Sequence, residues 1–178
     1  KYEEVVLMTA SLARLLRQSI SNEDEVVPLA REVEYAKGYL TIQKMRYKDK
    51  LEFEIDVEPS ILNIPLIKLV LQPIIENAIY HGLKYKESKG LLQVKGFMKD
   101  GNAVLQVIDN GVGMDEETLS HIYDKHKVNY HSNGVGVYNV QKRLKLYYGE
   151  NYGITYESEK GVGTTATIII PGIQEESI

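Results

Sequence analysis

The sequence predicts an α+β protein, a two-layer α/β sandwich in which helices cover one face of a mixed, mostly antiparallel sheet. Residues 51–57, LEFEIDV, alternate apolar and acidic side chains, as a strand with one buried face does. Asp100-Gly101 lies between two apolar runs and is a strong hairpin signal. Helical patterns occur in pairs between the strands and not in strand–helix–strand repeats. This order favours a sheet of about four or five strands, most of them antiparallel.

Two amphipathic helical patterns precede the first strand. Apolar residues in 1–20 recur at helical spacing without an N-cap, so we expect the chain to begin inside a longer protein. A second helix is predicted over 28–47, with Leu29, Ala36 and Leu40 on its apolar face. The two helices either pair as a hairpin or dock on the following domain, and the pattern does not choose between them. We divide the chain into a helical segment (1–48), a main domain (49–173) and a short tail (174–178).

The main domain continues with a helix that follows Asn63 and Pro65 and contains LQPIIENAIYHG, residues 71–82. Pro73 lies inside this stretch and is predicted to kink or split the helix, because proline removes a backbone donor. Two strands then flank Asp100-Gly101, and a further helix ends at Gly149. The domain closes with a hairpin over 154–171.

Composition limits the classes of function. The 178 residues are 43% hydrophobic and 26% charged, as in an ordinary soluble globular protein. The net charge of −4 provides no electrostatic basis for binding nucleic acid. The absence of cysteine excludes disulfides, thiol catalysis and Cys-ligated zinc. No apolar run approaches the roughly 20 residues that cross a bilayer, and no signal peptide opens the sequence.

A first group of polar residues interrupts the apolar helix over 71–82. Asn77 and His81 are four residues apart, so they lie on one side of a helix, and Glu76 precedes Asn77. An amide oxygen is a hard ligand suited to Mg²⁺, and a carboxylate can orient water or accept a proton. The alternative is a solvated polar face with no ligand.

Two glycine-containing segments follow. In DNGVGM, residues 109–114, Asp109 comes at the end of a strand, where a buried carboxylate needs a donor such as an adenine amino group. Gly111 and Gly113 would let a flat ligand approach the backbone closely. The alternative is a plain Asp-Asn-Gly turn.

Two further glycine-containing segments follow, one before a predicted helix and one before the last predicted strand. NGVGVYNVQKRL, residues 133–144, leads a glycine pair into a helix, whose free N–H groups suit phosphate. It is neither a Walker loop nor a dinucleotide-binding fingerprint. GVGTT, residues 161–165, enters the last strand, and by itself it favours an ordinary glycine-rich turn.

A polar stretch over 115–132 separates these segments and is predicted to be a mobile lid over a nucleotide. It holds His121, His126 and His131, but their five-residue spacing does not place them on one helical face. We therefore do not favour a zinc site.

The order of the segments is more specific than any one of them. Glu-Asn-Ala-x-x-His-Gly, Asp-x-Gly-x-Gly, Gly-x-Gly before a helix and Gly-x-Gly-Thr at the last strand resemble the N, G1, G2 and G3 boxes of the GHKL ATPase superfamily. The resemblance covers roughly 51–171. LQPIIENAIYHG, NGVGVYNVQKRL and the stretch LARLLRQSI…VPLAREVEYAKGYLTIQKMRY are more narrowly similar to the LytS-type sensor histidine kinases.

This resemblance implies a Bergerat-type sandwich that binds ATP and Mg²⁺. By analogy Asn77 holds Mg²⁺, Glu76 is the catalytic acid near the γ-phosphate, and Asp109 receives the adenine amino group, with Gly113 beneath the base. Thr164 completes the adenine contacts, and the N–H groups of Gly134 and Gly136 face the phosphates. The further implied nucleotide contacts are His81, Lys84, Gly111, Met114 and Val135.

The resemblance also implies the partners. A LytS-type kinase transfers the γ-phosphoryl group to a histidine of its own dimerisation region, acts as a homodimer, passes the phosphoryl group to a response regulator, and is anchored in the bacterial cell membrane with this domain in the cytoplasm. No Pro-His-Phe-like acceptor box is present here, so we expect a fragment that binds nucleotide without phosphorylating itself. Two alternatives stay open. One is a GHKL ATPase that drives a conformational or dimerisation switch. The other is a non-catalytic interaction module that keeps the sandwich fold without binding nucleotide.

Overall fold

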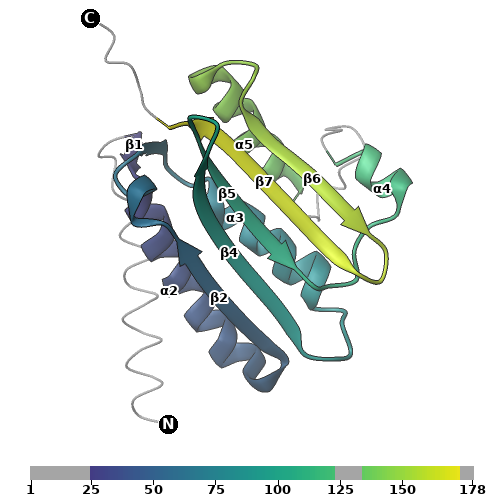
Figure 1. Cartoon of the computed structure of the whole chain (residues 1–178). Helices are drawn as coiled ribbons and strands as arrows, with labels where there is room; N and C mark the ends of the chain where they lie inside the picture. Colours follow the sequence, from purple (N-terminus) through teal and green to yellow (C-terminus); the bar gives the residue numbers. More distant parts are fainter. Residues whose placement is uncertain (1–24, 123–133, 173–178) are drawn as a thin grey trace, which may run out of the picture.

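The computed structural model describes residues 25–122 and 134–172. A five-stranded sheet runs through this part of the chain in the order β2-β4-β5-β7-β6, with β2 parallel to β4 and every other pair antiparallel (Figure 1). The mixed, mostly antiparallel sheet is therefore confirmed. The strands are β2 (Leu51–Val57), β4 (Gly90–Lys99), β5 (Asn102–Asp109), β6 (Gly153–Glu159) and β7 (Gly163–Pro171).

The longer helices lie together behind the sheet in Figure 1, which makes two layers. Alternate residues of the inner strands are fully buried against them, including Leu92, Leu105 and Ile168. This period of two produces a continuous apolar face on each strand. The helices are α2 (Leu29–Tyr47), α3 (Leu71–Asn77), the π-helical turn η3 (Ala78–Leu83) and α5 (Gly134–Tyr148), with α4 (Glu116–Ser120) beside β6.

The second predicted helix docks on the main domain. Docking was one of the two possibilities that the sequence left open. Leu29 and Leu40 of α2 are fully buried and belong to the same core as the sheet. The first predicted helix, over 1–20, lies outside the described residues.

The structure corrects the expected role of Pro73. Because α3 begins at Leu71, Pro73 lies in the first turn, where a backbone N–H has no acceptor within the helix. The proline therefore neither kinks nor splits this helix. The irregularity occurs further on, where α3 passes into η3 and the Lys84 N–H donates to the Ile79 carbonyl at 2.8 Å.

The remaining elements are short. β1 (Val26–Pro28) and β3 (Pro65–Ile67) pair antiparallel as a separate two-stranded sheet, which three-residue segments could not reveal by periodicity. η1 (Lys48–Lys50) and η2 (Pro59–Ile61) are single 3₁₀ turns. Asp100 and Gly101 both have positive φ, 50° and 77°, as the predicted tight hairpin requires.

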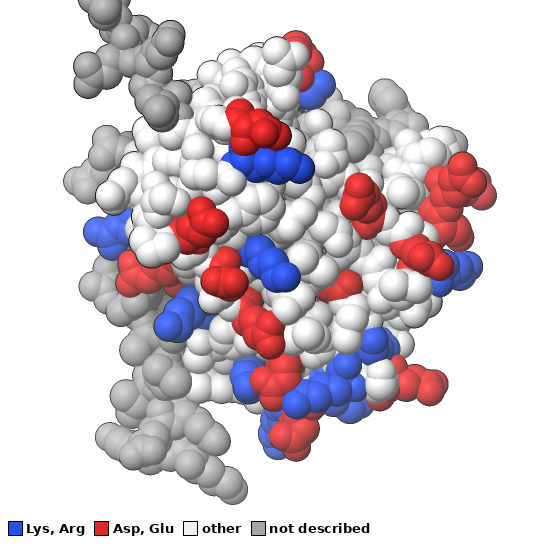
Figure 2. Space-filling view, in the orientation of Figure 1, with Lys and Arg blue, Asp and Glu red and all other residues white. Residues whose placement is uncertain are grey.

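Charged side chains of both signs lie on the surface. In Figure 2 the side of the molecule that presents the sheet shows acidic and basic side chains interspersed. Among the described helices, none combines the length and apolar character needed to cross a bilayer.

Candidate functional site

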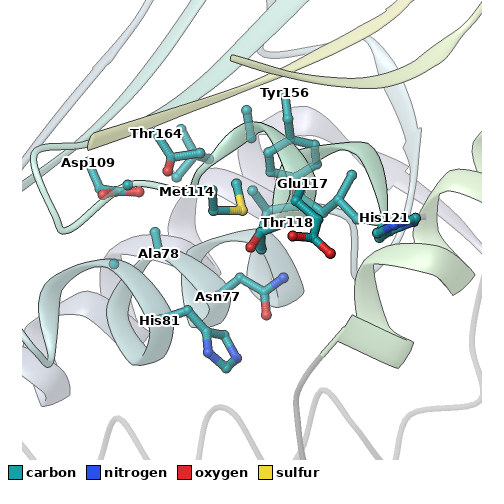
Figure 3. Close-up of a pocket in the computed structure, with 16 residues that line it drawn as sticks. Asn77, Ala78, His81, Asp109, Met114, Glu117, Thr118, His121, Tyr156 and Thr164 are labelled. Atoms are coloured by element: carbon teal, nitrogen blue, oxygen red, sulfur yellow. The ribbon is translucent and has the colours of Figure 1, made fainter. Parts of the chain in front are cut away.

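A cavity of about 540 Å³ lies between the helix α3–η3 and the end of the sheet. One wall carries Asn77 and His81, and Figure 3 shows Asp109 and Thr164 on the opposite side. α4 and the residues just after it complete the lining. A volume of this size suits a small organic ligand.

Asn77 is the last residue of α3 and lines this cavity. Its Oδ1 atom is buried and accepts no hydrogen bond from any described residue. A buried amide oxygen without a donor is rare, because its loss of water is not compensated. This atom is therefore suited to a cation or a donor that a ligand brings.

His81 lies on the same wall and is more exposed. Partial burial lowers the pKa of its imidazole, and the nearby charge of Lys84 lowers it further. Both effects favour the neutral ring, which can donate to or accept from a ligand.

Asp109 ends β5, as predicted, and is only 6% exposed. Its Oδ1 accepts a hydrogen bond from the Gly111 N–H at 2.8 Å. Burial raises the pKa of this carboxyl to about 6, although hydrogen bonds from the Gly111 and Thr164 backbones and the charge of Lys86 oppose the shift. These donors compensate the burial of the carboxylate only in part, so a ligand amino group would stabilise it further.

Two glycines pack directly against the Asp109 carboxylate, and a third packs against the closing hairpin. A Cβ on Gly82 would lie 2.7 Å from Asp109 Oδ1, and one on Gly111 would lie 2.6 Å from the same atom. Gly113 has φ of +63°, and a Cβ there would meet the backbone of Glu159. Gly82 was not among the predicted site residues, although the His-Gly pair after Asn77 was a usable signal.

Ser158 joins the loop after β5 to the closing hairpin. Its Oγ accepts from the Met114 N–H at 2.8 Å, donates to the Gly163 carbonyl at 3.0 Å, and lies 2.8 Å from Thr164 Oγ1. Thr164 is opposite Asp109 in the strand register, and both line the cavity. The sequence offered no signal for Ser158.

Much of the lining is apolar and was not predicted. Such residues cannot be distinguished from core residues by sequence pattern, because both are apolar and buried. A largely apolar cavity whose lining includes a buried carboxylate suits the chemistry of a purine base. These residues are Ile74, Ala78, Val107, Ile122, Tyr156 and Ala166.

α4 supplies part of the polar lining of the cavity. Asp115 caps it, accepting from the Thr118 N–H at 3.0 Å and from the Thr118 hydroxyl at 2.6 Å. These bonds lower the pKa of the Asp115 carboxyl. Glu117, Thr118 and His121 line the cavity, whereas the predicted lid beyond 122, with His126 and His131, lies outside the described residues.

Two predicted site residues face elsewhere in the described structure. Glu76 Oε1 accepts from Gln72 Nε2 at 3.0 Å, and the charge of Glu76 contributes to the raised pKa of Tyr39 on α2. Lys84 Nζ lies 5.5 Å from the centre of the Tyr85 ring. Neither residue is part of the cavity lining.

The predicted phosphate-binding glycines lie at the start of α5. The helix begins at Gly134, so Val135 and Gly136 belong to its first turn and do not precede it. Their N–H groups are among those without an acceptor inside the helix. Gly136 packs near α3, where an added Cβ would lie 3.2 Å from Pro73 Cβ.

Comparison with known proteins identifies the class. A family model described as histidine kinase-, DNA gyrase B- and HSP90-like ATPase matches residues 63–174, more than half of the chain. The chain therefore belongs to this family of ATPases. A second model, histidine kinase, matches residues 1–51.

The relatives point to one branch of this family. The chain is 31% identical to the sensor histidine kinase YesM of Bacillus subtilis over 95% of the chain and 28% of that protein. It is 34% identical to the sensor protein LytS of Oceanobacillus iheyensis over 79% of the chain and 24% of that protein. These matches confirm the resemblance to LytS-type sensor histidine kinases. The chain spans about a quarter of the length of these curated relatives.

Solved structures confirm the fold. The histidine kinase domain of the blue-light activated kinase EL346 from Erythrobacter litoralis superimposes with a TM-score of 0.61 at 16% identity, over 96% of this chain and 76% of that one. The catalytic domain of the histidine kinase ThkA gives a TM-score of 0.60 at 13% identity, over 83% and 94% of the two chains.

Proposed function

We propose that the cavity binds Mg·ATP, with the base at Asp109 and the phosphates toward Asn77, and that the domain presents the γ-phosphoryl group to a histidine. The observation that carries this proposal is that one cavity combines a buried, unpartnered amide oxygen with a buried carboxylate. The first suits a metal-bound triphosphate and the second a purine amino group.

At the base end, Asp109 would accept the adenine amino group. Thr164, oriented by Ser158, would hold the opposite edge of the base, directly or through water. Gly113 and Met114 line the same end, and Gly111 supports it by fixing the Asp109 carboxylate. The apolar lining would exclude water from the faces of the ring.

At the phosphate end, Asn77 Oδ1 would be a protein ligand of Mg²⁺. Among the described residues no group of three His, Asp or Glu side chains could hold a metal ion, so phosphate oxygens and water would complete its shell. When bound, Mg²⁺ would offset the charge that develops on the phosphates. His81 and the first-turn N–H groups of α5, at Gly134, Val135 and Gly136, are the candidate phosphate contacts.

The residues of this chain would act by position and electrostatics. Asp109 and Thr164 fix the base, and Asn77 fixes the metal end, so that the γ-phosphoryl group faces the opening beside α4. Few covalent steps are required of the protein in such a transfer.

The proposed biological setting follows the sensor kinases. The phosphoryl group would pass to an acceptor histidine in the dimerisation region and from there to a response regulator, in a homodimer anchored in the bacterial cell membrane. In this scheme residues 1–48 belong to the dimerisation region, 49–173 to the ATP-binding domain and 174–178 to a tail.

Hydrolysis as the main function is less well supported. The carboxylates that line the described part of the cavity are Asp109, at the base end, and Glu117 on α4, whereas Glu76 faces Gln72. If Glu76 nevertheless reaches the phosphates as the catalytic acid, Glu76→Ala will abolish steady-state ATP hydrolysis. If its contacts are only structural, hydrolysis will persist in that variant.

The proposal is tested by calorimetric titration with a non-hydrolysable ATP analogue and Mg²⁺. Asp109→Asn replaces an acceptor oxygen with a donor and should weaken binding about 100-fold. Asp100→Asn is the matched control, because it makes the same change at an exposed turn where asparagine tolerates positive φ. No binding by the parent at millimolar nucleotide, or equal affinities for the parent and Asp109→Asn, would refute the proposal.

A further inference from the structure

A second buried carboxylate, outside the cavity, holds the start of α3. Glu32 lies on α2 and is 2% exposed. Its Oε1 accepts from the Leu69 N–H at 2.8 Å, and its Oε2 accepts from the N–H groups of Val70 and Leu71 at 3.0 and 3.2 Å. Since all three partners are donors, the ionised carboxylate satisfies them best. Neither Glu32 nor its three partners line the cavity described above.

The segment held by Glu32 is strained and has a second support. Leu69 has φ of +63°, a left-handed conformation that is strained for a bulky side chain. Arg143 of α5 donates to the preceding carbonyl, from Nη2 to Lys68 O at 2.9 Å. Burial raises the pKa of the Glu32 carboxyl, and the three N–H groups and the charge of Arg143 oppose that shift. The turn therefore depends on side chains from two other helices.

The geometry connects this turn to Asn77. α3 begins at Leu71, one of the three donors, and ends at Asn77. Six residues of α-helix span about 9 Å, a distance over which a helix moves as one rigid element. By contrast, Asp109 is held by the register of β5 and β7 and by Gly111, without contact with this turn.

The contact also joins two family segments. Glu32 lies within residues 1–51, which match the histidine kinase model, and Leu69–Leu71 lie within 63–174, which match the ATPase model. It is therefore a direct bond between the helix that leads into the domain and the helix that carries Asn77.

We propose that Glu32 is a positioning residue that places Asn77 in the cavity by tying the start of α3 to α2. The inference rests on the proposed function, because it takes Asn77 as a ligand of Mg²⁺. A displacement of α2 is then transmitted to the metal end of the site and leaves the base end in place.

The test compares nucleotide affinity with Mg²⁺ and with EDTA. Glu32→Gln replaces one acceptor oxygen with an amide that cannot accept from the backbone. We expect about tenfold weaker binding of the Mg·ATP analogue and less than about twofold change without Mg²⁺. Glu34→Gln, an exposed acid on the same helix, is the matched control and should match the parent in both titrations.

A double-mutant cycle separates positioning from general damage. If Glu32 acts through Asn77, Glu32→Gln combined with Asn77→Ala will bind Mg·nucleotide no more weakly than Asn77→Ala alone. Additive losses, equal weakening with and without Mg²⁺, or no weakening would each overturn the proposal. Should Glu32→Gln fail to fold, Glu32→Asp provides the same comparison, because it keeps the charge and withdraws it from the N–H groups.

Hydrogen exchange distinguishes this inference from the function on which it rests. Without nucleotide, Glu32→Gln should accelerate exchange from Leu69 through α3 to Asn77 and leave β5 unchanged. Acceleration that stops at Leu71 would overturn the positioning role even if the parent binds ATP. A parent that binds no nucleotide refutes the proposed function, and with it the role in metal binding, whatever the exchange shows.

Discussion

The two ends of the cavity are built in different ways. At the base end, Asp109 and Thr164 face each other in a strand register, and glycines with no room for a side chain fix the surrounding backbone. At the proposed phosphate end, Asn77 lies on a helix whose first N–H groups donate to a carboxylate of another helix. Under the proposed function, this difference gives the site one rigid end, which recognises the base, and one end whose position other parts of the protein can change.

The largest effect is expected from filling the space at Gly113. Gly113→Ala places a Cβ against the Glu159 backbone at φ of +63°, and should lower the free energy of unfolding by about 3 kcal/mol or more. Gly161→Ala is the control, since Gly161 has φ of +84° with no atom within 4 Å of the added Cβ, and should lose about 1 kcal/mol. Urea unfolding measures both. Equal losses would show that the base end is less rigid than described.

The next effect is a dependence of stability on pH that arises from Asp109. Its pKa is raised from 3.8 to about 6, so the stability it contributes is complete below pH 3.8 and is lost as the pH rises through about 6. This shift corresponds to about 3 kcal/mol. Asp109→Asn removes the titration, so its stability relative to the parent should increase by about this amount between pH 4 and pH 7. A difference that stays flat across this range, in urea titrations at each pH, would contradict the assignment.

A smaller effect is expected on the helical side, at Tyr148. Its hydroxyl donates to the Pro65 carbonyl and accepts from the Ile67 N–H, both at 3.2 Å, which ties α5 to β3. Tyr148→Phe leaves both partners without a hydrogen bond and should cost about 1–2 kcal/mol of stability. Tyr147→Phe, at a neighbouring tyrosine that is 46% exposed, should cost less than about 0.5 kcal/mol. Thermal unfolding distinguishes them, and a larger loss for Tyr147→Phe would reject the proposed tie.

The smallest loss of stability is expected for Ser158→Ala, whose main effect should be on nucleotide binding at the base end. Ser158→Ala removes the hydroxyl that orients Thr164 and holds the Met114 N–H, at a cost of about 1 kcal/mol. We expect nucleotide affinity to fall about fivefold both with and without Mg²⁺, because the base end is affected. Ser60→Ala, at an exposed serine whose hydroxyl donates to Glu58, serves as the control. A loss of affinity seen only with Mg²⁺ would contradict the placement of Ser158 at the base end of the site.

The sequence predicted the elements with strong periodicity and the polar residues with a distinctive order. β2, the hairpin at Asp100-Gly101, α2 and α5 lie close to their predicted positions because each has a clear period or turn residue. Asn77 and Asp109 were predicted as site residues because an amide and an acid are conspicuous among apolar residues, and both line the cavity.

What was missed depends on contacts distant in sequence. Glu32 and Ser158 are ordinary polar residues in their own segments, and only the fold brings them to Leu69 and Thr164. The short strands β1 and β3 stabilise each other and have no pattern of their own. Pro73 was misjudged because the start of α3 is set by the Glu32 carboxylate, which local signals do not reveal.

The π-helical turn between Asn77 and Lys84 gives this helix one residue more than a regular helix of that length would need. Upstream of it the helix is fixed by its bond to α2, and downstream Gly82 packs on Asp109, so the surplus residue reconciles two anchors that a regular helix could not both reach. Deleting one residue within 78–81 would restore the regular spacing and rotate Asn77 by about 100° relative to Gly82. The shortened helix would then keep only one of its two anchors and lose the placement of Asn77 relative to Asp109, so the irregular turn, more than the regular part of the helix, positions the proposed metal ligand.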